Sequence, residues 1–105
     1  MYDIVATAMR FEWEANKNRG NLVKHKVSFE TAIAVFDDQH AVSIQDRMVD
    51  GEERWQTLGM IDEIVLIVAH TWSDEEGDEV IRLISARKAT PSERRVYAEN
   101  QQRPS

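Results

Sequence analysis

The stretch Glu79-Val80-Ile81-Arg82-Leu83-Ile84-Ser85-Ala86-Arg87-Lys88-Ala89 organises the predicted fold. Its β-branched and apolar residues are typical of a strand with two covered faces, and the strand ends in a basic pair. In a regular strand Arg82 shares a face with Val80 and Ile84, where an unpaired charge is costly to bury. We therefore expect an anion beside Arg82, either a carboxylate of this protein or the phosphate of a ligand.

Arg82 and Arg87 fall on opposite faces of this strand if its geometry is regular, because side-chain direction alternates at every residue. They share a face only if a bulge or bend lies near Ser85-Ala86, or if Arg87 already belongs to the following loop. The alternative role of these cations, and of Lys88, is pairing with local acids such as Glu76, Asp78 and Glu79.

Length and composition are those of one small domain. The chain has 105 residues and no cysteine, so we expect a single domain over 1–105 in a reducing, cytoplasmic setting. The longest apolar run, 64–69, is far shorter than the roughly 20 residues of a membrane helix. The ends, 1–9 and 101–105, are expected to be poorly ordered. A net charge of −6 argues against avid binding to bulk nucleic acid, yet 80–105 is basic whereas 41–79 is strongly acidic.

Hydrophobic periodicity predicts an α+β fold with a small antiparallel sheet, two helices in the N-terminal half and one C-terminal helix. Ser28 is a suitable N-cap, and Thr90, Pro91 and Glu93 form a capping-box sequence. The segment 64–72 is apolar on both faces and is therefore expected at the centre of the sheet. The predicted strands are 9–14, 41–44, 54–61, 64–72 and 79–89; the predicted helices are 15–25, 28–37 and one from 91; acidic loops are predicted at 46–53 and 73–78, and a tight connection at 62–63.

Several blocks of the sequence resemble the BrnT family of toxins. They occur in the order of the family between about Arg10 and Glu99, although Lys26 replaces a usual glycine. The blocks are Phe11-Glu12-Trp13-Glu14, Asn21-Leu22-x-Lys24-His25, Val35-Phe36-Asp37-Asp38, Gly51-Glu52-Glu53-Arg54-Trp55 and Ile84-Ser85-Ala86-Arg87-Lys88-Ala89.

The resemblance implies a RelE-like fold and a ribonuclease toxin of a type II toxin–antitoxin pair. Such a toxin cuts RNA without a metal or other cofactor and inhibits translation. Its implied partner is a BrnA-like antitoxin with a ribbon-helix-helix part. The complex is expected to contact operator DNA only through this antitoxin. A toxin homodimer within a 2:2 complex is the implied assembly, and no membrane is involved. The alternative is a catalytically degenerate module that only binds its antitoxin and aids autoregulation.

Metal-free RNA cleavage needs a group that removes a proton from the 2′-hydroxyl and a cation that stabilises the phosphorane. Arginine suits the second task because its planar fork binds two phosphate oxygens. With the resemblance, this assigns Arg82 and Arg87 to the phosphate, and His25 or Glu12 to proton transfer. For His25 the alternative is a role at the C-terminus of its helix, where positive charge is favoured.

Five further residues are candidates for binding RNA: Arg54, Lys24, Lys88, Arg94 and Tyr97. For Arg54, pairing with Glu52 or Glu53 is an equally good explanation. Arg94 and Tyr97 lie one helical turn apart and either line the cleft or dock the last helix onto the sheet. His70 is expected to be a core residue, and three isolated histidines do not predict a metal site.

Overall fold

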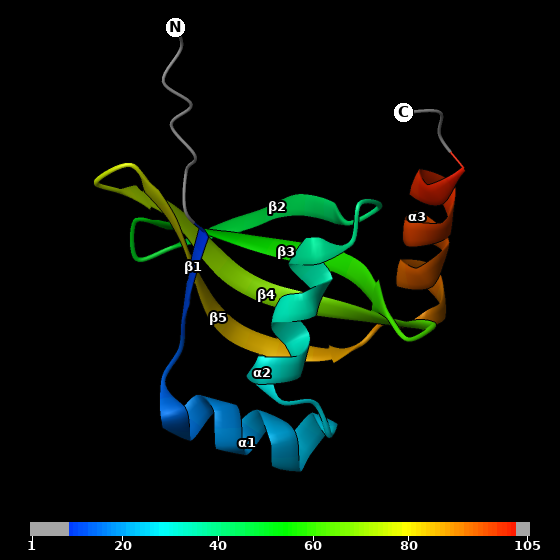
Figure 1. Ribbon diagram of the computed structural model, residues 1–105, viewed down its shortest axis with the longest axis horizontal. Coiled ribbons are helices and arrows are strands. Elements are labelled where there is room, and N and C mark those ends of the chain that lie inside the picture. Colours follow the sequence, from blue (N-terminus) through cyan, green and yellow to red (C-terminus); the bar gives the residue numbers. More distant parts are fainter. Residues whose placement is uncertain (1–8, 103–105) are drawn as a thin grey trace, which may run out of the picture.

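The computed structural model describes residues 9–102, in which a five-stranded sheet carries helices on both faces (Figure 1). The strand order is β1-β5-β4-β3-β2. The predicted α+β class is confirmed, while the expectations for 1–8 and 103–105 lie outside the described residues. The elements are β1 (Met9–Glu12), α1 (Ala15–His25), α2 (Phe29–Ala32), the 3-10 helix η1 (Ile33–Asp37), β2 (Val42–Val49), β3 (Glu52–Ile61), β4 (Ile64–Glu75), β5 (Asp78–Lys88) and α3 (Pro91–Gln101).

Two-residue hairpins join β2 to β3, β3 to β4 and β4 to β5. The predicted tight connection at Asp62-Glu63 is confirmed, with φ angles of 48° and 68°. The acidic loops predicted at 46–53 and 73–78 were wrong, because both segments continue as strands and only Asp50-Gly51 and Glu76-Gly77 remain as turns. Both residues of each pair have positive φ, the conformation that tight hairpins require. Acidic side chains are tolerated in these strand ends because they are solvent exposed.

The sheet is mixed. The strands from β2 to β5 form the predicted antiparallel meander, but β1 pairs with β5 in parallel, with Met9 opposite Glu79 and Glu12 opposite Arg82. The expectation of a purely antiparallel sheet is corrected at this strand. Parallel pairing is possible because no hairpin joins β1 to β5; the chain leaves β1 through α1 and α2 and returns to the opposite edge.

Asn21 forms hydrogen bonds with the backbone at the edge of β5, beyond the point where its pairing with β1 ends. Its Nδ2 donates to the carbonyls of Ala86 at 2.7 Å and Val27 at 2.8 Å, and its Oδ1 accepts from the Ala86 N–H at 3.1 Å. The amide thus satisfies both backbone groups of one strand residue. This contact fixes α1 beside β5. In Figure 1, α1 lies along the β5 side of the sheet.

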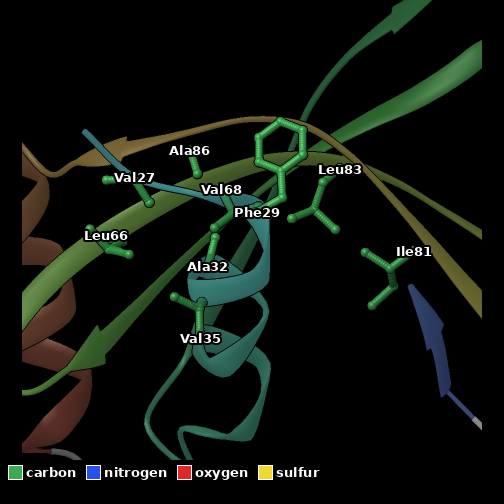
Figure 2. Packing of buried hydrophobic residues seen from close by; sticks show 9 residues of the cluster. All are labelled: Val27, Phe29, Ala32, Val35, Leu66, Val68, Ile81, Leu83 and Ala86. Atoms are coloured by element: carbon green, nitrogen blue, oxygen red, sulfur yellow. The ribbon is translucent and has the colours of Figure 1, made fainter. Parts of the chain in front are cut away.

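One face of the sheet, here called the helical face, is covered by α2 and η1. Ser28 caps α2 as predicted, accepting a bond from the Thr31 N–H at 3.1 Å. The helix predicted over 28–37 begins in the expected place but changes to 3-10 geometry at Ile33. Figure 2 shows the resulting core, in which Phe29 and Leu83 are among the fully buried side chains; its members are Val27, Phe29, Ala32, Val35, Leu66, Val68, Ile81, Leu83 and Ala86.

The last helix, α3, covers one end of the opposite face. The capping box predicted at its start is confirmed: the Thr90 side chain accepts from the Glu93 N–H, and the Glu93 side chain accepts from the Thr90 N–H. The buried Tyr97 packs on β3 and β4 with Leu58, Val65, Ile67 and Ala89. In Figure 1, α3 stands at the end of the sheet away from the tips of the β2–β3 and β4–β5 hairpins. No helix in residues 9–102 is long and apolar enough to cross a membrane.

Candidate functional site

A β-bulge brings Arg82 and Arg87 to the same face of the sheet. In the pairing of β5 with β4, Leu83 lies opposite His70 whereas Ser85 lies opposite Ala69, so Ile84 is an extra residue without a partner. The extra residue reverses the alternation of side chains along β5. The sequence indicated that Arg82 and Arg87 could share a face if a bulge or bend lay near Ser85-Ala86. The structure has such a bulge, immediately before Ser85.

The cross-strand partners identify this shared face. Arg82 lies opposite Thr71 and Arg87 opposite Ile67, and these two residues of β4 point the same way because they are four positions apart. At about 3.3 Å per residue, the Cα atoms of the two arginines are about 13 Å apart along the strand. They are therefore placed to hold separate points of an extended anion rather than to bind one phosphate together.

The face opposite α2 also carries Glu12 and Arg54. Glu12 lies directly beside Arg82 in the parallel pairing of β1 with β5. Arg54 alternates with Gln56, whose partner Ala69 points the same way as Thr71. We call this surface, bearing Glu12, Arg54, Arg82 and Arg87, the arginine face. Because α3 covers only one end of it, these side chains are not enclosed.

Arg82 meets an internal carboxylate. Its Nη2 lies 2.5 Å from Oε1 of Glu52, and the same oxygen lies 3.9 Å from Nε of Arg54. Arg54 Nε is buried and lacks a hydrogen-bond partner among the described residues. Arg82 shares its face with Val80 as predicted, and the anion expected beside it is a carboxylate of this protein, but its side chain is 46% exposed rather than buried. Glu52 therefore occupies, between two arginines, a position suited to an anionic oxygen.

Arg87 is held by the N-terminus of α3. Its Nη1 and Nη2 donate to the two carboxylate oxygens of Glu93 at 2.8 and 3.0 Å, a bidentate geometry. The bonds from Arg87 lower the pKa of Glu93 to about 2, against the opposing effect of partial burial. The same pairing raises the pKa of Arg87. Arg87 thus remains a fixed cation at the edge of the open surface.

Tyr97 docks α3 instead of lining the open face. Its hydroxyl donates to Oδ2 of Asp38, which also accepts from the Met60 N–H at 2.8 Å. Burial and this carboxylate raise the pKa of Tyr97 to about 12. Partial burial opposes ionisation of Asp38, but its hydrogen bonds outweigh that effect and its pKa is lowered. Arg94, on the same helix, donates to the Ala89 carbonyl at 3.0 Å.

The remaining predicted site residues lie elsewhere. Lys88 follows Arg87 and therefore points to the helical face, where it lines a cavity of about 270 Å³ beside Lys26 and Leu66. Lys24 and His25 lie in the last turn of α1. His25 shares a side of α1 with Asn21, four residues earlier, and is half-buried. The structure does not bring these cations onto the arginine face.

His70 is a core residue, as predicted. It is fully buried, its Nε2 lies 2.7 Å from Oγ1 of Thr57, and its Nδ1 lies 3.0 Å from the carbonyl of Thr71. Burial lowers its pKa, because the charged imidazolium is poorly solvated there. Over residues 9–102, no group of three or more His, Asp or Glu side chains is arranged to hold a metal ion.

Two residues that shape the site were not predicted to do so. Glu52 was considered only as a partner of Arg54, and Glu93 only as a helix cap. The signal for Glu93 lay in its place in the capping box, six residues after Arg87 and on the first turn of the helix that directly follows β5. No local signal pairs Glu52 with Arg82, since the contact joins β3 to β5 across β4.

The chain matches one family model over residues 13–93, from the residue after β1 to the first turn of α3. The model describes the ribonuclease toxin BrnT of type II toxin–antitoxin systems. The match includes Arg54, Arg82, Arg87 and Glu93, whereas Glu12 immediately precedes it. No curated protein matches the chain. The chain therefore belongs to the BrnT family of ribonuclease toxins of type II toxin–antitoxin systems.

Proposed function

We propose that this protein is a metal-independent endoribonuclease that cleaves RNA on the arginine face and thereby inhibits translation. The observation that carries the proposal is the bulge at Ile84, which places Arg82 and Arg87 on the open face that also bears Glu12 and Arg54. Arg54, Arg82 and Arg87 share this accessible surface although the domain has a net charge of −6. RNA phosphates are the natural ligands of such a surface in a ribonuclease family.

The proposed reaction is attack by the 2′-hydroxyl oxygen on the adjacent phosphorus. Glu12, as a carboxylate, accepts the hydroxyl proton, and the new O–P bond forms a phosphorane whose negative charge Arg82 stabilises. The bond from phosphorus to the 5′-oxygen then breaks, and solvent water protonates the leaving oxygen. The products are a 2′,3′-cyclic phosphate and a 5′-hydroxyl. Arg87 and Arg54 hold neighbouring parts of the RNA strand.

Glu12 is the better supported proton acceptor of the two candidates. It lies beside Arg82 in the β1–β5 pairing, so a phosphate bound by Arg82 would lie within reach of its carboxylate. His25 belongs to α1, whose Asn21 contacts the edge of β5 rather than the arginine face. We therefore assign proton abstraction to Glu12 and leave His25 and Lys24 as contacts for RNA beyond the scissile bond.

The proposed biological setting is a cytoplasmic toxin neutralised by a BrnA-like antitoxin with a ribbon-helix-helix part. The support is the family, since type II systems pair a protein toxin with a protein antitoxin. Operator DNA is contacted through the antitoxin, and two toxins and two antitoxins form the complex. A net charge of −6 on the toxin is consistent with DNA binding by the antitoxin alone, because an acidic protein has little affinity for the DNA backbone.

The test is RNA cleavage by purified protein in the presence of a metal chelator. Wild-type protein is expected to give discrete fragments with cyclic phosphate ends. Arg82→Ala and Arg87→Ala should reduce cleavage, for Arg82 by about 10²–10³-fold, the usual effect of removing one donor to a developing charge. Both variants should also relieve growth arrest while keeping the circular dichroism spectrum of the wild type. Arg95→Ala, on the exposed side of α3, is the matched control.

A second candidate function is supported by the two ion pairs. Glu52 and Glu93 already occupy Arg82 and Arg87, as they would in a toxin that keeps its fold but no longer cleaves. Such a protein would serve only to bind the antitoxin and assist repression. Intact RNA after prolonged incubation, together with unchanged antitoxin binding by Arg82→Ala, would support this alternative and exclude the nuclease.

A further inference from the structure

The helical face carries an exposed aromatic patch near the tips of the β2–β3 and β4–β5 hairpins, beyond the end of η1. Trp55 and Trp72 meet edge to face, with ring centroids 5.6 Å apart and planes at 73°. Trp72 is 39% exposed, and the neighbouring Met9 and Met48 are 42% and 57% exposed. We call these four residues the Trp72 patch. Exposed aromatic and methionine side chains grouped in this way are typical of protein-binding surfaces.

The register places all four side chains on one face. Trp55 lies opposite His70, which alternates with Trp72 in β4. Trp72 lies opposite Ile81, which alternates with Glu79, and Glu79 lies beside Met9. On the other side Met48 lies opposite Glu53, which alternates with Trp55. The patch therefore crosses the sheet from one edge strand, β1, to the other edge strand, β2.

Acidic side chains on the same face flank the patch. Asp74 and Glu79 lie directly opposite one another, an arrangement of like charges that destabilises a strand pair. Asp74 accepts a bond from the Gly77 N–H at 3.1 Å in the turn. No lysine or arginine within residues 9–102 forms an ion pair with Asp74, Glu79 or Glu53. The negative charge here is therefore not compensated within the described chain.

The other face of the same hairpin provides an internal comparison. There Glu75 and Asp78 also lie opposite one another, but Arg10 lies 3.6 Å from Asp78 and 4.0 Å from Glu75. One like-charged pair thus has a cation from its own chain, whereas the pair beside Trp72 does not. A cation from outside the chain would complete the second pair in the same way.

We propose that the Trp72 patch, with Glu53, Asp74 and Glu79, is the docking site for a basic, amphipathic segment of the protein antitoxin. Apolar side chains of that segment would cover Trp72 and the methionines. Its lysines or arginines would pair with the carboxylates and lie over the indole rings, where cation–π attraction adds to the ion pairs. The inference rests on the proposed pairing with an antitoxin and names the surface and the chemistry that it uses.

The charges also select among possible occupants. A phosphate backbone would be repelled by Glu53, Asp74 and Glu79, so the tryptophans are poorly placed to stack RNA bases. A second copy of this chain would bring the same acids against each other. The patch faces away from the arginine face, so docking there and cleavage of RNA should be separable by mutation.

The test is the affinity of the purified antitoxin for variants of the full chain, measured by titration calorimetry. Trp72→Ala and the double variant Glu53→Lys/Glu79→Lys should each weaken binding by about tenfold or more, as expected for a central tryptophan and for reversed complementary charges. The matched control is Glu63→Lys/Glu99→Lys, which makes the same charge change at the β3–β4 turn and on α3. The control should bind within about twofold of the wild type.

RNA cleavage without antitoxin is measured in parallel and should be unchanged in both patch variants. Wild-type antitoxin affinity in either patch variant would overturn the inference, even if the chain is an active nuclease. Loss of RNA cleavage in Trp72→Ala with unchanged antitoxin binding would also overturn it, in favour of an RNA platform. If no variant and no wild-type sample cleaves RNA, the proposed nuclease fails, while weakened antitoxin binding would still support the docking site.

Discussion

Arg82 and Arg87 point to the same face of the sheet although an odd number of positions separates them, because Ile84 is the extra residue of a β-bulge. Each guanidinium is held by a different carboxylate: Glu52 from β3 binds Arg82, and Glu93 from α3 binds Arg87. Carboxylates of the chain itself therefore hold both guanidinium groups in place. The two carboxylates differ, however, in whether an incoming phosphate would have to displace them.

In the proposed function Arg82 binds an RNA phosphate in the place where Glu52 now lies, so Glu52→Gln should raise RNA affinity. An exposed ion pair of this kind is worth about 0.5–1 kcal/mol, and removing it should tighten binding about two- to fivefold. The stability of the fold should change little for the same reason. The measurement is fluorescence anisotropy with a non-cleavable oligonucleotide that carries 2′-O-methyl groups.

Glu53→Gln provides the control for the Glu52 variant. It makes the same change in net charge one residue away, but its side chain lies on the helical face, opposite Met48. Equal gains in RNA affinity for both variants would attribute the effect to net charge alone. A loss of affinity in Glu52→Gln would mean instead that the carboxylate positions Arg82 for the phosphate.

Glu93 should stabilise the protein in a pH-dependent way. Its pKa is lowered from 4.5 to about 2, chiefly by the hydrogen bonds from Arg87. A group whose pKa is depressed in the folded state contributes stability above its unfolded value and loses it as pH falls through the folded value. Glu93→Gln should therefore cost about 1 kcal/mol near neutral pH, a figure reduced by solvent screening of the pair.

Urea denaturation of wild type and Glu93→Gln between pH 7 and pH 2 measures this difference. The stability gap should be full above about pH 5, shrink as the pH falls below about 4.5 and be largely lost at about pH 2, where roughly half of Glu93 is already protonated in the folded protein. Glu99→Gln, which makes the same change in net charge later on the same helix, is the matched control. A gap for Glu93→Gln that does not depend on pH would assign its effect to packing.

Local signals in the sequence were sufficient for much of the fold. Ser28 and Thr90 cap their helices as predicted, because a cap depends on residues within one turn. The apolar run within β4 lies at the centre of the sheet, because a strand covered on both faces needs apolar residues at every position. The loops predicted at 46–53 and 73–78 were wrong because local composition was again the only signal. Charged residues there resemble a loop but belong to exposed hairpin strands.

The candidate site depends on features that no local pattern contains. Ile84 is an ordinary strand residue, and its role as the bulge is defined only by the pairing of β5 with β4. Arg82 is exposed because α3 packs at the other end of that face, on Leu58 and Ile67. The position of Glu12 depends on parallel pairing between the two most distant strands in the sequence. Sequence reasoning named all four residues of the arginine face as candidates by residue type, and the fold supplies their common surface.

Asn21 should be among the most sensitive positions outside the hydrophobic core. Asn21→Ala removes three hydrogen bonds and leaves the N–H and carbonyl of Ala86 without their side-chain partner. Buried backbone groups that lose their partners cost about 1–3 kcal/mol each, so we expect a loss of about 2–4 kcal/mol. Chemical denaturation measures it, with Asn16→Ala on the exposed side of α1 as the control. Equal stability of the two variants would mean that water replaces the Asn21 amide.

Gly59 is required by the close approach of η1 to β3. A Cβ atom at this position would lie 2.6 Å from Cγ1 and 2.9 Å from the carbonyl oxygen of Val35, and the second atom belongs to the backbone and cannot rotate away. Gly59→Ala should therefore destabilise the protein by about 1–3 kcal/mol through overpacking. Gly20→Ala is the contrasting substitution, since nothing lies within 4 Å of its Cβ position inside α1. It should stabilise the protein by about 0.5–1 kcal/mol, because alanine loses less backbone entropy than glycine in a helix. Denaturation midpoints that shift in opposite directions would establish that contact with η1, rather than a general preference for glycine, fixes position 59.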